Sequence, residues 1–126
     1  MKTAQQMVAE AKARIREINP KEAAEAIARA DLLLDVREAD EYAAGHLAGA
    51  VNIPRGLVEF KFSATPEYAS PELAIVVYCK TSGRAALVAC ALKEMGYRNV
   101  TSILGGYDAW LAEGRPLVTP SLPAFG

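Results

Sequence analysis

A cysteine at the start of a short polar loop is the residue of this sequence best suited to chemistry. Cys79 follows the apolar run 74–78, and a glycine, two cationic side chains and the helix-forming run 85–89 come after it. A strand, a tight turn and a helix N-terminus in this order direct backbone amides at one point. Those amides and the charges of Lys80 and Arg84 favour a thiolate at Cys79. The segment therefore predicts a nucleophilic thiolate in an anion-binding pocket.

Two reactions use a thiolate held in this way: attack on a phosphate ester, and uptake of a sulfane sulfur to form a persulfide. Cysteine phosphatases of this layout have a loop one residue longer, which wraps the phosphate oxygens. Here only the four residues of the segment 80–83 separate Cys79 from Arg84. The tighter loop suits one added sulfur atom better, and it offers no carboxylate to protonate a leaving group.

The predicted site is the loop itself. We expect Cys79 to be the catalytic nucleophile, and we expect the substrate-binding residues to be Lys80, Thr81, Ser82, Gly83 and Arg84. The backbone amides of 80–84 would hold the added sulfur, while the two cations attract an anionic donor. A cation at a helix N-terminus opposes the helix dipole, which favours anion binding as the role of Arg84. The alternative is a structural cysteine sealed from water.

Composition excludes several other classes of protein. A chain of 126 residues forms one domain and buries enough surface to need no disulfide. Its 14 basic and 15 acidic side chains nearly cancel, which argues against a nucleic-acid partner. Cys79, Cys90 and the single histidine, His46, lack the spacing of metal ligands, so we expect neither a metal nor a cofactor.

The N-terminus predicts a cytoplasmic protein. It alternates alanine with charged residues, whereas a secretory peptide would show an uninterrupted apolar stretch. No run approaches the roughly 20 apolar residues of a membrane span. Free thiols favour a reducing compartment.

The order of elements predicts an α/β fold. Helices are expected over 3–14, 20–29, 38–44, 56–63, 84–95 and 107–112, and strands over 32–36, 50–53, 73–78 and 100–104. Residues 15–18 either extend the first helix or form a short strand. Alternating strands and helices imply parallel pairing with helices on both faces of the sheet. The ligand crevice of such a sheet lies beyond the carboxyl ends of its strands, where Cys79 and Asp35 fall.

Three segments resemble the single-domain rhodaneses, which are thiosulfate sulfurtransferases. The first runs from Leu33 through Gly45-His46-Leu47-Ala48-Gly49-Ala50 to Pro54, the second is Tyr78–Arg84, and the third is Gly105-Gly106-Tyr107-Asp108-Ala109-Trp110. Two positions depart from the family pattern: Ser82 stands where a glycine is usual, and Ala48 replaces a proline.

The resemblance implies a rhodanese-like, three-layer α/β domain with a mainly parallel sheet of about five strands. We divide the chain into an N-terminal helical extension, 1–17, a rhodanese domain, 18–117, and a C-terminal tail, 118–126. The implied reaction moves a sulfane sulfur from thiosulfate or a similar anion, through a Cys79 persulfide, to cyanide or a thiol. A persulfide carrier without turnover and a cysteine phosphatase or arsenate-reductase-like enzyme remain alternatives.

Other residues have structural interpretations. Asp35 and Arg37 lie near the crevice as supporting residues, and we favour an ion pair that ties the strand end to the next helix. The resemblance implies a structural hydrogen bond for His46. Trp110 is expected to anchor the last helix, and Cys90 is expected to be a small buried hydrophobe. The sequence leaves open whether Glu59, Phe60 and Phe62 line the pocket.

Overall fold

The computed structural model describes residues 1–120, which form a parallel sheet covered by helices on both faces. Five strands pair in the order β1-β6-β5-β2-β4, and each pair is parallel. Their bounds are β1 Arg16–Ile18, β2 Leu32–Asp35, β4 Val51–Asn52, β5 Ala74–Tyr78 and β6 Asn99–Ile103. This confirms the predicted α/β fold and its mainly parallel sheet, and it resolves the ambiguous segment 15–18 as largely strand.

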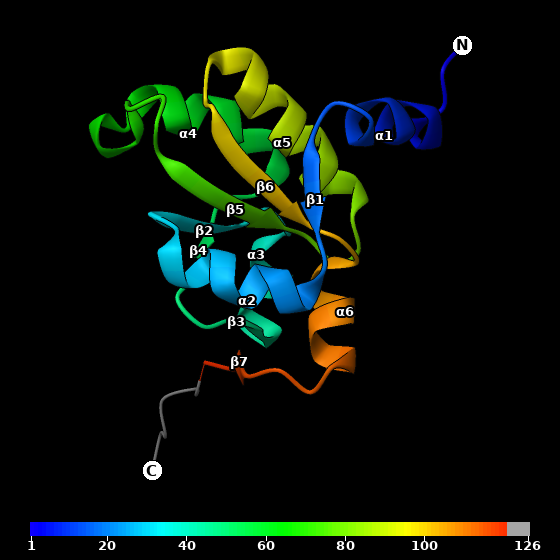
Figure 1. The fold of residues 1–126 in the computed structure, drawn as a ribbon, viewed down its shortest axis with the longest axis vertical. Coiled ribbons are helices and arrows are strands. Elements are labelled where there is room, and N and C mark those ends of the chain that lie inside the picture. The colour runs from blue at the N-terminus through cyan, green and yellow to red at the C-terminus, as the bar shows by residue number, and fades with distance from the viewer. Residues whose placement is uncertain (121–126) are drawn as a thin grey trace.

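Within residues 1–120, six α-helices cover the two faces of the sheet (Figure 1). They are α1 Ala4–Lys12, α2 Pro20–Arg29, α3 Ala39–Ala44, α4 Val58–Ala64, α5 Gly83–Met95 and α6 Gly106–Ala112, with 3-10 turns η1 Arg55–Leu57 and η2 Pro66–Tyr68. Local signals place their ends. Asn19 and Glu22 form a reciprocal capping box at α2, and Gly96 ends α5 with a left-handed φ of 111°.

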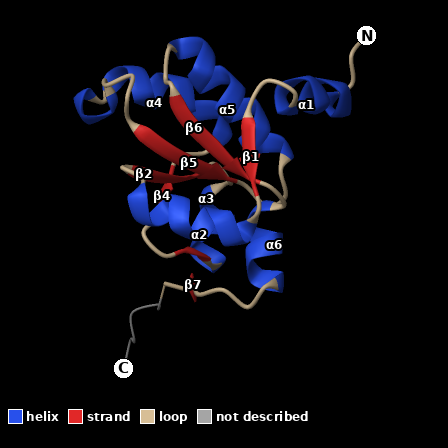
Figure 2. Cartoon of the chain, viewed as in Figure 1, coloured by secondary structure: helices blue, strands red, loops and turns tan. Residues whose placement is uncertain are grey.

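Two apolar clusters fill the space between the sheet and its helices. Along β5 and the residue after it, Ile75, Val77 and Cys79 belong to the cluster beneath α4 and α5. Val76 and Tyr78 belong to the cluster beneath α2 and α6. This alternation follows from the strand period of two residues. Figure 2 shows the resulting three layers, with helices on both sides of the strands.

A second, two-stranded sheet was not predicted. β3 (His46–Leu47) pairs antiparallel with β7 (Leu117–Val118), so the start of the predicted tail is held against the segment after α3. Two-residue strands carry no periodic signal, and only tertiary proximity creates their pairing. The remainder of that tail, 121–126, lies outside the described residues.

The N-terminal helix packs onto the domain. α1 begins at a capping box between Thr3 and Gln6, and its main contacts are with α5. The predicted extension, 1–17, reaches into β1, which pairs with β6. The division into extension, domain and tail stays a prediction.

Candidate functional site

Cys79 lies where β5 ends and the loop to α5 begins. Its side chain is on the α5 face of the sheet and is 1% exposed. In this conformation almost no water reaches the thiol, a degree of burial that matches the alternative of a structural cysteine. The cause is the depth of the strand end beneath the first turns of α5, where Ala85 and Ala86 are also fully buried.

The thiol sits at the N-terminus of a 13-residue helix, α5, and accepts a hydrogen bond from the backbone N–H of Ala85 at 3.3 Å. The donor is one residue beyond the predicted set of amides. Ser82, the residue before α5, makes no side-chain cap, because its hydroxyl accepts from the Gly105 N–H at 2.9 Å. The sulfur therefore takes the place of a capping oxygen at the positive end of a helix dipole, where negative charge is stabilised.

The loop is fastened to α6 through its carbonyl groups. The amides of Tyr107 and Asp108 donate to the carbonyl oxygens of Cys79 and Lys80 at 2.9 and 3.0 Å. In a trans peptide the carbonyl and the following N–H point in opposite directions. The amides of Lys80 and Thr81 therefore point away from the α6 amides that bind these carbonyl oxygens.

The two loop cations are both paired with carboxylates. Lys80 is 59% exposed and contacts Asp108 at 2.7 Å. The guanidinium of Arg84 binds both oxygens of Glu41, at 2.8 and 3.1 Å, in a half-buried pair. Glu41 and Asp108 lie within the segments that resemble the rhodaneses, but nothing local in the sequence connects them to Arg84 and Lys80, which are 43 and 28 positions away.

The Glu41 and Arg84 pair shifts the ionisation of both groups. The hydrogen bonds from Arg84 outweigh burial and lower the pKa of Glu41 to about 2. The hydrogen bonds to Glu41 raise the pKa of Arg84, and the charge of Cys79 adds to this increase. Arg84 is therefore electrostatically coupled both to a carboxylate and to the thiol.

Asp35 and Arg37 form a buried network beside the loop. Arg37 donates to both carboxylate oxygens of Asp35 and to the Gly45 carbonyl, while the Tyr78 hydroxyl donates to Asp35 at 2.7 Å and accepts from the Leu47 N–H. Burial lowers the pKa of Arg37, but the hydrogen bond and the charge of Asp35 outweigh burial, so the pKa of Arg37 is raised overall. For the Tyr78 hydroxyl, burial itself raises the pKa, because it disfavours the charged form. The expected ion pair between Asp35 and Arg37 is present, but it ties the strand end to the Gly45–Leu47 segment after α3 and not to the helix itself.

Two structural interpretations of aromatic residues are confirmed. The Nδ1 atom of His46 lies 3.0 Å from the Tyr42 carbonyl oxygen, and its ring stacks on the Tyr42 ring at 3.7 Å. Trp110 is buried beneath the sheet in the α6 cluster and donates to the Pro116 carbonyl. His46 and Trp110 therefore hold neighbouring elements in place, and their hydrogen bonds go to residues other than Cys79.

The structure also bears on the open question of α4 and on the prediction for Cys90. Phe62 is buried in the core, Phe60 is 74% exposed, and Glu59 pairs with Arg55 at 3.3 Å, so these residues of α4 do not act together. Cys90 is half-buried and borders a groove between α1 and α5. The prediction that it is a buried hydrophobe is wrong, because α1 covers only part of that face of α5.

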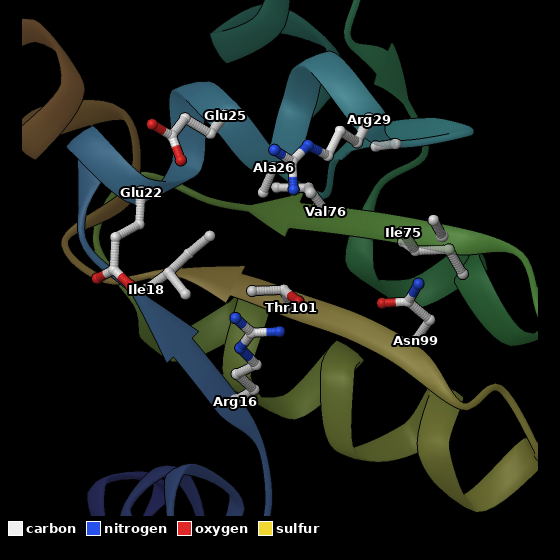
Figure 3. Close-up of a pocket in the computed structure, with 12 residues that line it drawn as sticks. Arg16, Ile18, Glu22, Glu25, Ala26, Arg29, Ile75, Val76, Asn99 and Thr101 are labelled. Atoms are coloured by element: carbon white, nitrogen blue, oxygen red, sulfur yellow. The ribbon is translucent and has the colours of Figure 1, made fainter.

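A separate groove of about 350 Å³ includes Arg16 of β1, Arg29 of α2 and Thr101 of β6 in its lining (Figure 3). Val76 also lines it, and Val76 points to the face of β5 opposite that of Cys79. The groove therefore lies across the sheet from the thiol and contributes nothing to this site.

Among residues 1–120, none of the helices has the length and the apolar character that a membrane span needs.

Comparisons with known proteins agree on one family. Residues 19–113 match the family described as the rhodanese-like domain. The thiosulfate sulfurtransferase GlpE of Haemophilus influenzae is 33% identical over 104 residues, which cover 82% of this chain and 95% of that protein.

Two solved structures are similar over most of their length. A polysulfide-sulfur transferase homodimer from Wolinella succinogenes is 34% identical with a TM-score of 0.76, and the match covers 91% of this chain and 86% of that one. A Rhodopseudomonas palustris protein of unknown function, described as a possible tyrosine phosphatase, is 28% identical with a TM-score of 0.81, and the match covers 94% and 96%.

Proposed function

Because the chain belongs to the rhodanese-like domain family, we propose that it is a sulfurtransferase acting through a persulfide on Cys79. The observation that carries the proposal is the Cys79 thiol at the N-terminus of α5, where it accepts the Ala85 N–H. The names of relatives, a thiosulfate sulfurtransferase and a polysulfide-sulfur transferase, support the same chemistry.

The reaction has two displacements. The Cys79 thiolate attacks the outer sulfur of thiosulfate, the S–S bond breaks, and sulfite leaves with the bonding electron pair. A disulfanide, Cys79–S–S⁻, remains, and cyanide or a thiolate then attacks its outer sulfur and regenerates the Cys79 thiolate. The charge stays near the sulfur throughout, so the helix dipole of α5 stabilises the resting thiolate and the persulfide alike.

The loop residues have separate roles in this scheme. The amides turned away from α6 and the Ala85 N–H hold the added sulfur, whereas Lys80 and Arg84 attract the donor. Because Cys79 is buried, loading requires a local movement that opens the sulfur to the donor. The free thiols support a reducing compartment such as the cytoplasm as the place of action.

Persulfide formation is tested directly by mass. Incubation with thiosulfate should add the mass of one sulfur atom to the wild type and to Cys90→Ser, and nothing to Cys79→Ser. Iodoacetamide should likewise modify Cys79 in the folded protein, and thiosulfate should slow that modification. Sulfur on the Cys79→Ser variant, or a Cys79 that never reacts while Cys90 does, contradicts the proposal.

A persulfide carrier is the second candidate, and the burial of Cys79 favours it. A carrier would load to one sulfur per chain and discharge to cyanide or thiols very slowly, whereas an enzyme would turn over many times. The description of the Rhodopseudomonas protein motivates a third assay, hydrolysis of an aryl phosphate. Hydrolysis without sulfur loading would replace the sulfurtransferase proposal with phosphatase chemistry.

A further inference from the structure

We infer that Glu41 is a specificity-determining residue that selects against doubly charged sulfur donors, an inference that rests on the proposed function. The donor class favoured by the site is a sulfane anion with a single negative charge, such as a thiosulfonate or the persulfide of a thiol. Thiosulfate, a dianion, would then be a poor donor for this chain.

The geometry places Glu41 in competition with the donor. Its two oxygens engage both terminal nitrogens of Arg84, at 2.8 and 3.1 Å. A guanidinium has five N–H donors in a fixed planar fork, and a bidentate carboxylate occupies the edge that an oxyanion would bind. An anionic donor must therefore displace Glu41 or bind to the remaining edge of Arg84.

The rest of the loop offers little positive charge. Lys80, the other loop cation, is paired with Asp108 at 2.7 Å. Glu38 adds a third carboxylate whose charge reaches Arg84. Arg37 also acts on Glu41, but it is already paired with Asp35. Three cations thus stand against four carboxylates, and each extra negative charge on a donor raises the cost of its approach.

The two donor classes can be compared with matched compounds. Methanethiosulfonate is thiosulfate with one charged oxygen replaced by a methyl group. The Cys79 thiolate attacks its outer sulfur, the S–S bond breaks, methanesulfinate leaves with the electron pair, and the same Cys79 persulfide forms. The two reactions differ in the charge of the donor and of the leaving group.

The test is the kcat/KM of both donors in the wild type, Glu41→Gln and Asp40→Asn. Glutamine keeps the side-chain shape and a hydrogen-bond acceptor but removes the charge. Asp40 is exposed and, within residues 1–120, forms no ion pair, so its variant controls for the loss of one nearby negative charge. Glu41→Gln should raise the preference for thiosulfate over methanethiosulfonate about fivefold, and Asp40→Asn should change it less than twofold.

The outcomes separate the two proposals. An unchanged donor preference in Glu41→Gln, with sulfur loading intact, overturns the inference and leaves the proposed function standing. Absence of loading by either donor in every variant overturns the proposed function. A binding readout covers a Glu41→Gln variant that turns over poorly: half-protection of Cys79 from iodoacetamide should need about fivefold less sulfate than in the wild type. Equal sulfate requirements contradict the role of Glu41.

Discussion

Cys79 and Arg84 act at one helix terminus but by different physics. The Cys79 sulfur accepts the Ala85 N–H at the start of α5, a position where a fixed helix dipole favours negative charge. Arg84 carries its charge on a long side chain, and Glu41 holds that charge in an ion pair. Lys80 is more exposed and is screened by water, so in the proposed reaction we expect it to contribute less to donor binding than Arg84.

The two cations are therefore predicted to differ in steady-state kinetics with thiosulfate. Arg84→Ala should lower kcat/KM by about tenfold more than Lys80→Ala. Removal of Arg84 takes away a donor contact and also leaves Glu41 as an uncompensated charge near the thiol. Equal losses, or a larger loss for Lys80→Ala, would contradict this ranking.

At the scale of elements, the loop 79–84 is held between the N-termini of two helices, α5 and α6. α5 faces the sulfur, and α6 binds the backbone carbonyls of the same loop from the other side of the sheet. Gly106 makes the second contact possible. A Cβ atom at this position would overlap the carbonyl oxygens of Cys79 and Thr81.

Gly106→Ala is predicted to lower both the unfolding free energy and the sulfur loading of Cys79 by more than backbone strain alone explains. Gly106 has φ of 51°, and Gly114 has φ of 68° with open space around it, so Gly114→Ala is a matched control. Both variants should lose about 1–2 kcal/mol of unfolding free energy from the left-handed conformation. Only Gly106→Ala should lose more than that and also load sulfur poorly. Equal unfolding free energies by urea titration, with equal loading, would show that the close approach of α6 is unimportant.

At the scale of the whole molecule, one ion pair between distant segments connects the crossover after β2 to the start of α5. The Glu41 and Arg84 pair spans 43 residues of sequence. Because the pKa of Glu41 falls from 4.5 to about 2 on folding, the folded state binds fewer protons than the unfolded state between these values. The stabilisation is complete above about pH 4.5 and is lost as the pH falls toward 2.

Urea unfolding between pH 2 and 7 tests this linkage. The wild type should exceed Glu41→Gln by less than about 1 kcal/mol above pH 4.5, since the pair is partly exposed, and the difference should vanish near pH 2. Arg84→Ala should abolish the same acid-dependent difference, because it removes the partner. A difference that persists unchanged to pH 2 would contradict the lowered pKa of Glu41.

Local physics made much of this fold predictable from sequence. The Asn19 and Glu22 capping box, the left-handed Gly96 and the alternation of apolar strands with helices depend on residues close along the chain. The parallel sheet follows from that alternation, since parallel strands require crossover helices. The position of Cys79 at a strand end was likewise predictable, because the apolar run stops there.

The sequence alone thus determined the class of fold, the loop and its candidate nucleophile. Only the tertiary structure decided how much water reaches Cys79, which amide contacts its sulfur, where Cys90 lies, and that Glu41 and Asp108 neutralise the loop cations. The reason is range: caps and periodicity act over a few residues, whereas burial and ion pairing depend on segments that meet only when the sheet has assembled.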